Sequence, residues 1–447
     1  MEHLCIIGNG ISGITTARHV RKQKSAAECK ITVISAETDH FFSRTALMYI
    51  YMGHMTYENT KPYEDFFWDK NNINLVRGYV NQVDTANKQL VFSDRDPISY
   101  DKLVLGVGSV PNRIGWPGEA LKGVNSLVSY QDLEQMEENT RGKINRAVIV
   151  GGGLIGIEMA EMLMSRNIPV TFFIREKEYW SNVLPPEEAA MVSRHARKHH
   201  LDLRPESGIT EILGDDQGRV QGVKTVEDEE VPCQFVGITI GVKPAIGFLK
   251  NSNIKTDRGI LVDEYFETSV PGVYAVGDCA QYSNPPAGRK PIDQIWYTGR
   301  MHGETLAQTL CGKKTAYQPG IFFNSAKFFD IEYQVYGEVK PQVQAHEMHF
   351  YWEHPDGEKA VRLVFHRDEH HILGFNLMGI RFRHEVCDRW IKRRTPVTDV
   401  VKDLRKANFD PELFKSYEPQ IREQFNREFP ELAVKTKRNV VSAILGL

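Results

Sequence analysis

The sequence lacks the features that mark membrane, secreted and nucleic-acid-binding proteins. Its 447 residues contain no run of about 18 apolar residues, the length that a membrane-spanning helix needs. The first residues enter an apolar stretch at 4–8 without the charged and apolar regions of a signal peptide. The formal net charge of −3 gives no overall attraction to nucleic acid or to an anionic membrane. We therefore expect a soluble, cytoplasmic protein that does not bind nucleic acid.

Cysteine is scarce and scattered. The six cysteines form no C-x-x-C pair, no zinc-type spacing and no dense framework, so we expect reduced thiols. They are Cys5, Cys29, Cys233, Cys279, Cys311 and Cys387. Histidines are frequent near the C-terminus, but their spacing fits no recognised ligand pattern, and we expect no metal site. These histidines are His346, His349, His354, His366, His370 and His371.

The sequence does contain a repeat, in which a strand, a glycine-rich turn, a helix and a second strand follow one another. In the first copy these segments are expected at 4–7, 8–13, 14–24 and 31–34. In the second copy they are expected at 147–150, 151–156, 157–165 and 170–174. This β-α-β order is typical of dinucleotide-binding folds, so two nucleotide-binding units are predicted.

The first glycine-rich turn fits the pattern G-x-G-x-x-G. Gly8 makes the tight turn, Gly10 lets the backbone approach a pyrophosphate, and Gly13 lets helix and strand pack closely. Amides at the helix N-terminus then hold the negative phosphates. Glu37 follows the second strand, where a carboxylate accepts hydrogen bonds from ribose hydroxyls. This context favours a bound dinucleotide over a purely structural turn.

The second turn has the same three glycines, Gly151, Gly153 and Gly156, but a different residue after its second strand. Arg175 comes first there and Glu176 follows. An arginine in this place pairs with a 2′-phosphate, which favours NADPH over NADH. The alternative is a solvated pair between the two side chains, and NADH then remains the cofactor.

With these units the sequence resembles the two-dinucleotide-binding-domain flavoproteins of the glutathione-reductase-like superfamily. Residues 78–80 resemble the segment whose valine, here Val80, contacts the FAD adenine. Residues 103–111, which include Gly108, resemble the crossover where the chain leaves the FAD domain. The resemblance covers about residues 1 to 318 and implies FAD and a nicotinamide dinucleotide as cofactors.

The resemblance continues through a second FAD motif at residues 268–278. By this match Asp278 would hydrogen-bond the ribityl chain of the flavin. The helix expected from Thr298 resembles the one whose N-terminal amides face the flavin pyrimidine edge, and Trp296 before it is placed to wall the ring system.

The implied fold class is α/β, with two Rossmann-like dinucleotide-binding domains and a C-terminal α+β domain. The FAD-binding domain is expected at 1–115 and 255–318, and the NAD(P)H-binding domain at 116–254. Residues 319–447 are expected to form an interface domain with a helical extension, because residues 322–339 resemble the start of the interface domain of these reductases. Alternating aromatic and polar stretches after residue 319 indicate an antiparallel sheet, and a charged helical segment follows. Relatives of this kind commonly form homodimers, which we expect here.

The lack of cysteine in one segment indicates the subclass of flavoprotein. Disulfide reductases of the superfamily place redox cysteines in the segment that corresponds to residues 40–49, which here has none. The segment instead resembles the Tyr-x-Arg-x-x-Leu element of ferredoxin, rubredoxin and nitrite reductase-type members and of apoptosis-inducing-factor-like proteins, with Phe42 in place of the tyrosine. In that match Arg44 supports the FAD pyrophosphate.

Many of those relatives pair a lysine near flavin N5 with a glutamate on the helix of the second unit. Glu158 occupies the glutamate position and is the predicted catalytic residue. Tyr49 occupies the lysine position, so the usual pair is missing.

These observations predict an FAD-dependent NAD(P)H oxidoreductase that passes electrons to an unidentified acceptor, such as a small redox protein or a quinone. One alternative is a peripheral quinone-reducing NADH dehydrogenase, in which the basic segment 381–415 and the apolar residues 439–447 contact a membrane. The other is a redox-sensing flavin-binding interaction protein with vestigial turnover, an interpretation that Tyr49 favours.

Overall fold

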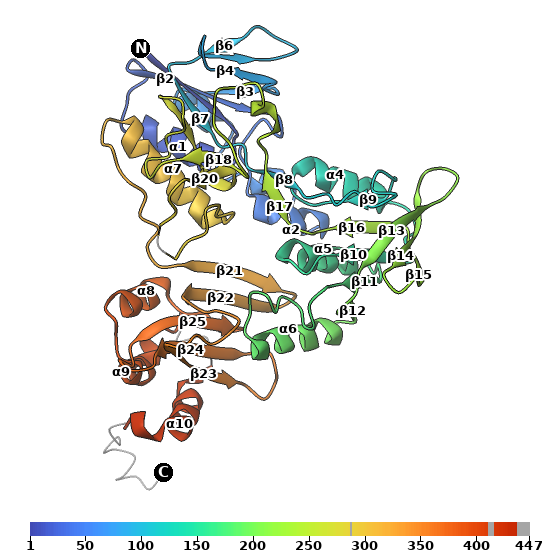
Figure 1. Ribbon diagram of the computed structural model, residues 1–447, viewed down its shortest axis with the longest axis vertical. Coiled ribbons are helices and arrows are strands. Elements are labelled where there is room, and N and C mark those ends of the chain that lie inside the picture. The colour runs from blue at the N-terminus through green and yellow to red at the C-terminus, as the bar shows by residue number, and fades with distance from the viewer. Residues whose placement is uncertain (287, 410–414, 436–447) are drawn as a thin grey trace. The chain divides into compact units, whose positions relative to one another are not determined.

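The structure is a computed structural model in which two compact units are distinguished (Figure 1). The residues that it describes are 1–286, 288–409 and 415–435. The first unit comprises Met1–Phe173 and Ser207–Pro319, and the second comprises Ile174–Glu206 and the chain from Gly320 onward. The apolar residues 439–447 lie outside the described residues. The predicted division into three domains stays a prediction.

The first unit contains a parallel sheet with the strand order β19-β7-β1-β2-β3. Its strands are β1 (Glu2–Ile7), β2 (Cys29–Ser35), β3 (Ile73–Arg77), β7 (Lys102–Leu105) and β19 (Val273–Ala275). Most residues of the central strands are buried, as expected of a sheet covered on both faces. Helices α1 (Ile11–Arg21) and α7 (Trp296–Leu310) pack along each other beside the sheet (Figure 1).

A second parallel sheet repeats this plan within the same unit. In it, β10 (Ala147–Val150) lies between β11 (Val170–Phe173) and β16 (Phe235–Ile238), and β9 (Val124–Asn125) pairs with β16. The order β11-β10-β16 therefore repeats the order β2-β1-β7 of the first sheet. Helix α5 (Leu154–Ser165) follows β10 as α1 follows β1. The repeat predicted from the sequence is thus confirmed.

Two short strands lie where the chain passes between the parallel sheets. Strand β8 (Ser109–Pro111) follows β7, and β17 (Val242–Pro244) follows β16 on the way back. The two strands pair antiparallel, so both crossings are held together by backbone hydrogen bonds. The segment predicted as a crossover at 103–111 therefore becomes β7, a glycine turn and β8.

The second unit contains a five-stranded antiparallel sheet, as the alternating pattern after residue 319 predicts. Its order is β21-β22-β25-β24-β23. The strands are β21 (Phe323–Phe328), β22 (Ile331–Gly337), β23 (Glu347–Glu353), β24 (Ala360–His366) and β25 (Ile372–Met378). Helices α8 (His384–Lys392) and α10 (Glu418–Glu428) pack on this sheet, and Phe350, Phe375 and Phe425 belong to the buried cluster between them.

Helix α6 (Pro186–Lys198) joins the same unit through a buried ion pair with β24. Along β24, Val361 and Leu363 belong to the hydrophobic cluster, so the alternation of a strand directs Arg362 to the other face. There its guanidinium donates two hydrogen bonds of 2.7 Å to the carboxylate of Glu188. The two side chains are 3% and 1% exposed, so each charge depends on the other for solvation.

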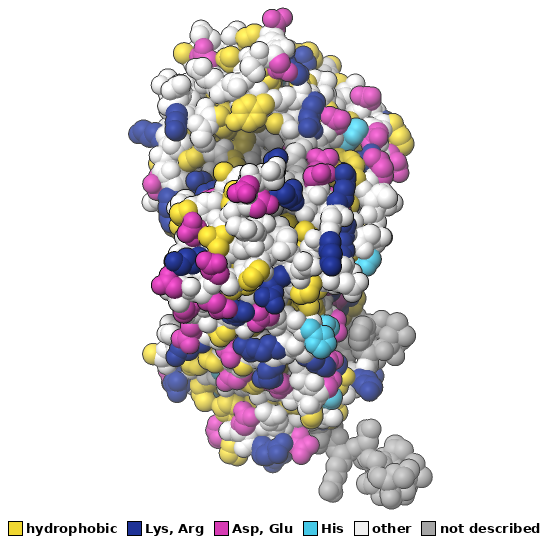
Figure 2. Space-filling view, turned by 90° about the vertical axis from the view of Figure 1, so that its right-hand side faces the viewer, with side chains coloured by type: hydrophobic (Ala, Val, Ile, Leu, Met, Phe, Trp, Pro, Cys, Tyr) yellow, Lys and Arg dark blue, Asp and Glu magenta, His cyan; other side chains and the backbone are white. Residues whose placement is uncertain are grey.

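The distribution of surface charge and the length of the helices indicate which kinds of partner the protein can bind. On the face drawn in Figure 2, acidic and basic side chains are interspersed rather than gathered by sign. Such a face has no field of one sign that would attract a polyanion. Every helix among the described residues is too short or too polar to cross a bilayer.

We predict that Arg362→Ala lowers the free energy of unfolding by about 3–5 kcal/mol, because it leaves the Glu188 carboxylate buried without a counter-charge. Urea unfolding followed by circular dichroism measures the change. The matched control is Arg381→Ala, which removes an ion pair to Glu332 whose side chains are 45% and 44% exposed. That control should cost less than about 1 kcal/mol. Equal losses in the two variants would contradict the assignment.

Candidate functional site

The first corner, residues 8–13, joins β1 to α1 in a way that only glycine allows. Gly8 has φ +108°, and a Cβ added to it would lie 2.1 Å from the carbonyl oxygen of Gly106. A Cβ on Gly13 would lie 2.1 Å from the carbonyl oxygen of Gly8. Gly10 is different, because it precedes the helix in extended conformation and a Cβ there would meet nothing within 4 Å. The open space beside Gly10 and the helix amides fit a pyrophosphate group.

Glu37 and Arg44 meet beyond the end of β2. The Arg44 guanidinium donates to both carboxylate oxygens of Glu37, at 2.7 and 2.5 Å. The backbone N–H of Tyr130 donates to Oε1 of Glu37 at 2.9 Å, and Arg44 also donates to the carbonyl of Val128. The sequence predicted separate ligand contacts for these two side chains and did not predict that they pair with each other. Their roles toward ribose and pyrophosphate stay predictions.

Asp278 lies in the short 3-10 helix η4 (Gly277–Cys279), directly after β19. Its Oδ2 accepts a hydrogen bond from the Ser109 hydroxyl at 3.2 Å, and Gln294 donates to that hydroxyl at 2.8 Å. Burial raises the pKa of the Asp278 carboxyl, while the Ser109 hydrogen bond and the charge of Arg44 act in the opposite direction. The acid therefore stands at the carboxyl edge of the sheet, where ligands of parallel sheets bind.

A residue that sequence reasoning missed, His302, positions this turn from α7. The backbone N–H of Gly277 donates to Nδ1 of His302 at 3.1 Å, and Nε2 lies 2.8 Å from the Tyr282 hydroxyl. Because Nδ1 accepts, Nε2 is the protonated nitrogen of the ring. Burial lowers the pKa of His302 to about 3, so the ring is neutral. A histidine within a helix gives no sequence signal for such a role.

The remaining predicted FAD contacts lie in the same unit. Val80 is buried just after β3, and Gly108 adopts φ +66° after β7. Trp296 begins α7, and its ring meets that of Tyr297 edge to face at 5.4 Å. The first turn of α7 lies close to the first corner, since a Cβ on Gly299 would come within 3.3 Å of Ile11.

The second corner, residues 151–156, has the same construction. Gly151 has φ +116°, and a Cβ on it would lie 2.5 Å from the carbonyl oxygen of Thr239. A Cβ on Gly156 would lie 2.5 Å from the carbonyl oxygen of Gly151, whereas one on Gly153 would meet no atom closer than 3.9 Å. The middle glycine of each corner therefore borders open space. Arg175, predicted to bind a 2′-phosphate, is exposed in the second unit, and its role stays a prediction.

Glu158 lies in α5, two residues beyond the second corner. Burial raises the pKa of its carboxyl to about 7, and the negative charge of Glu161 adds to the shift. The short helix α2 (Leu47–Tyr51) packs against α5, and its Tyr49 ring stacks on His54 at 6.1 Å. Tyr49 thus brings no positive charge to the position where the resemblance would lead one to expect a lysine. A carboxyl with a pKa near 7 can accept or donate a proton at physiological pH.

Arg166 holds α2 to α4 (Tyr130–Asn139) and α5, which the sequence did not reveal. Its guanidinium lies 3.5 Å above the Tyr51 ring and donates to the Tyr51 carbonyl at 3.0 Å. It also pairs with Glu137 of α4 at 2.5 Å. The Tyr51 hydroxyl donates to Thr140 at 2.8 Å. Helix α2 is therefore fixed at its C-terminal end.

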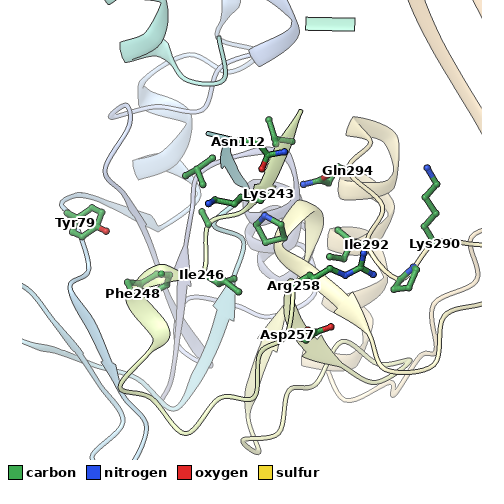
Figure 3. A pocket seen from close by; sticks show the side chains of 16 residues that line it. Tyr79, Asn112, Lys243, Ile246, Phe248, Asp257, Arg258, Lys290, Ile292 and Gln294 are labelled. Atoms are coloured by element: carbon green, nitrogen blue, oxygen red, sulfur yellow. The ribbon is translucent and has the colours of Figure 1, made fainter. Parts of the chain in front are cut away.

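A cavity of about 950 Å³ opens in the first unit beside the Asp278 hydrogen bonds (Figure 3). Gln294, which donates to Ser109, is part of its lining. In Figure 3, Phe248 lies on one side of the cavity, and Lys290 and Ile292 lie on the opposite side. The lining thus combines apolar surface with basic side chains, a mixture that suits an amphiphilic or anionic molecule.

Comparisons with known proteins agree with this geometry. The family model for pyridine nucleotide-disulphide oxidoreductase matches residues 2–303. The chain is 29% identical over 335 residues to the 5,5'-dehydrodivanillate O-demethylase ferredoxin reductase subunit of Sphingobium sp. (strain NBRC 103272 / SYK-6), covering 74% of this chain and 80% of that protein. It is 28% identical over 337 residues to the NAD(P)H nitrite reductase of Bacillus subtilis (strain 168), covering 74% of this chain but only 40% of that protein.

Solved structures show the same fold. A NAD-dependent persulfide reductase from A. fulgidus has a TM-score of 0.81 and 21% identity, covering 96% of this chain and 84% of that one. A ferredoxin reductase from Rhodopseudomonas palustris has a TM-score of 0.75 and 20% identity, covering 85% of this chain and 91% of that one.

The fold and the two glycine corners define a flavoprotein oxidoreductase, and the chain belongs to the pyridine nucleotide-disulphide oxidoreductase family. Its relatives include ferredoxin reductases and a nitrite reductase, so the predicted superfamily and subclass are confirmed. The predicted enzyme class and the cofactors FAD and NAD(P)H are confirmed as well. The contacts predicted for single residues stay predictions.

The first corner generates a prediction with a matched control. Gly8→Ala should lower the free energy of unfolding of the apoprotein by about 2 kcal/mol or more, because its Cβ would clash with the Gly106 carbonyl. Gly10→Ala should leave that stability within about 0.5 kcal/mol and weaken FAD binding at least tenfold. Urea unfolding and fluorescence titration with FAD measure the two effects. Unchanged FAD affinity in Gly10→Ala would argue against a pyrophosphate at this corner.

The raised pKa of Glu158 generates a pH prediction. A carboxyl with a folded-state pKa of about 7 and an unfolded value of 4.5 binds its proton more tightly in the folded protein. Its contribution to stability is complete below pH 4.5 and is lost as the pH rises through 7. As the pH rises from 4.5 to 7, the free energy of unfolding of the wild type should therefore fall relative to that of Glu158→Gln. Glu161→Gln should reduce this loss, and parallel pH profiles for the wild type and Glu158→Gln would refute the shift.

Proposed function

We propose that this protein transfers hydride from NAD(P)H to FAD and passes the electrons to a small redox protein. The observation that supports this most strongly is the pair of glycine corners, each with open space beside its middle glycine. When bound, FAD accepts hydride from the nicotinamide ring and releases electrons to an acceptor. Ferredoxin reductases among the relatives support the acceptor class.

In this proposal the protein's own residues bind and orient the two dinucleotides. The N-terminal amides of α1 would hold the FAD pyrophosphate, and those of α5 would hold the nicotinamide dinucleotide. Asp278, whose carboxylate accepts a hydrogen bond from Ser109, would hold the flavin side chain. Glu158, with its pKa near 7, would hold or release a proton at its carboxyl at physiological pH.

The cysteines support an electron path without a protein thiol. All six are free, and all except Cys311 are buried. Cys279 adjoins Asp278, yet burial raises the pKa of its thiol to about 12. Because the thiolate is the reactive form, this sulfur is inert at physiological pH. Electrons would then leave the flavin directly for the acceptor.

The cavity favours one second candidate, the reduction of a small organic acceptor such as a quinone. Its volume of about 950 Å³ lies within the range of small-molecule sites, and Ile246, Phe248 and Ile292 give it an apolar lining. A substitution that fills it, Ile292→Trp, separates the two candidates, because it would block a quinone and spare a redox protein that docks on the surface.

Arg175 favours NADPH over NADH. The resemblance of the C-terminal sheet to interface domains favours a homodimer, which light scattering of the purified protein would reveal. The cytoplasmic location stays a prediction.

Anaerobic mixing with NADPH tests the proposed function. The flavin absorbance band should bleach at least as fast as the enzyme turns over with an acceptor. Arg175→Ala should slow the bleaching by NADPH about tenfold and leave the bleaching by NADH unchanged. Glu176→Ala is the matched control and should keep the preference for NADPH. If neither nucleotide bleaches the flavin, the hydride transfer is wrong. Fast bleaching with negligible turnover on ferredoxin and quinone would instead favour the redox-sensing interaction protein.

A further inference from the structure

Two histidines and an aspartate converge in the second unit, and none of the three is among the residues assigned to either dinucleotide. His195 lies in the last turn of α6 and His199 follows the helix as its C-cap. A spacing of four places both side chains on one face. Asp330 comes from the two-residue turn between β21 and β22. One ligand atom from each residue can be chosen so that all three lie within 4.8 Å of one another.

The atoms that converge are those that bind metals in proteins. Nε2 of His195 contacts Oδ1 of Asp330, and Nε2 of His199 lies 3.3 Å from the same oxygen. In a tetrahedral zinc site with bonds of about 2.0–2.1 Å, neighbouring ligand atoms lie about 3.3 Å apart. The second contact already has this separation. The contact between His195 and Asp330 must widen, and Asp330 can move because its side chain is 67% exposed.

The turn that presents Asp330 is unusual. Phe328 pairs with Ile331, which leaves Phe329 and Asp330 as the turn. Phe329 adopts φ +55°, a left-handed conformation that is rare for a bulky residue. Its ring stacks flat on His199, with centroids 4.7 Å apart and planes at 4°. The stacking fixes the plane of the His199 ring, and packing fixes His195, whose side chain is 2% exposed.

A simple hydrogen bond is the competing explanation. A histidine in the last turn of a helix is stabilised there when charged, and Asp330 would serve as its acceptor. That explanation requires only one histidine. It does not account for a second imidazole whose Nε2 approaches the same carboxylate oxygen and whose ring is held by Phe329.

We propose that His195, His199 and Asp330 bind a divalent transition metal ion of the zinc type, with water completing the coordination. Two imidazoles and one carboxylate select such ions over magnesium or calcium, which prefer oxygen ligands. The ion would tie the C-terminal end of α6 to the β21–β22 hairpin. It would therefore stabilise the second unit and take no part in hydride transfer.

The second histidine cluster of this unit is a weaker candidate. His366, Glu369 and His371 also lie close enough to share an ion. However, Glu369 pairs with Arg394, and Nδ1 of His366 accepts backbone N–H bonds of 3.3 and 3.2 Å. From the spacing of the C-terminal histidines we expect no metal site, and the cluster of His195, His199 and Asp330 departs from that expectation.

Calorimetric titration of the tag-free, chelator-treated holoprotein with zinc chloride tests the proposal. We expect one zinc ion per chain and a raised melting temperature in its presence. His199→Ala and Asp330→Asn should each weaken zinc binding at least tenfold and abolish the rise in melting temperature. Both residues are partly exposed, so these variants should fold.

Two control variants test whether zinc binds at this cluster and not at a neighbouring histidine. His200→Asn changes the adjacent exposed histidine, and His366→Ala changes the other cluster. Both should keep full zinc affinity. The proposal is overturned if the wild type binds no zinc, if His366→Ala removes the binding, or if His199→Ala and Asp330→Asn bind zinc as tightly as the wild type. A fall in melting temperature in Asp330→Asn without zinc binding by the wild type would establish the hydrogen bond alone.

Discussion

The close approach of backbone to backbone at the two strand-to-helix corners is the constraint on which the rest of the structure depends. At the first corner Gly8 faces the Gly106 carbonyl, and at the second Gly151 faces the Thr239 carbonyl, with no room for a side chain between them. Each contact brings the end of a helix to the carboxyl edge of a parallel sheet. The helix amides and the strand ends then face the same space, where a dinucleotide can bind.

Much of this could be predicted from the sequence because its signals are local. The buried runs of β1 and β10, the three glycines after each and the acid after β2 lie within short stretches, and their spacing alone predicts a β-α-β unit. The antiparallel sheet of the second unit likewise follows from the alternating pattern after residue 319. The absence of cysteine at 40–49 similarly indicated the subclass to which the relatives point.

The features that the sequence did not predict join residues far apart in the chain. His302 holds the turn before Asp278 from a helix that begins 18 residues after it, and Arg44 reaches the Val128 carbonyl across 84 residues. Glu188 meets Arg362 across 174 residues, and Asp330 meets His195 across 135. No periodicity or local motif encodes such contacts, because they depend on how the elements pack. The cavity beside Gln294 is a property of packing in the same sense.

Binding stoichiometry measures whether one chain holds two dinucleotides at separate corners. The apoprotein is titrated calorimetrically with FAD, and the FAD-loaded protein is then titrated with oxidised NADP⁺. We expect one FAD and one NADP⁺ per chain, and we expect Gly153→Ala to lose NADP⁺ and keep FAD. Competition between the two ligands for a single site, or loss of FAD in Gly153→Ala, would contradict this expectation.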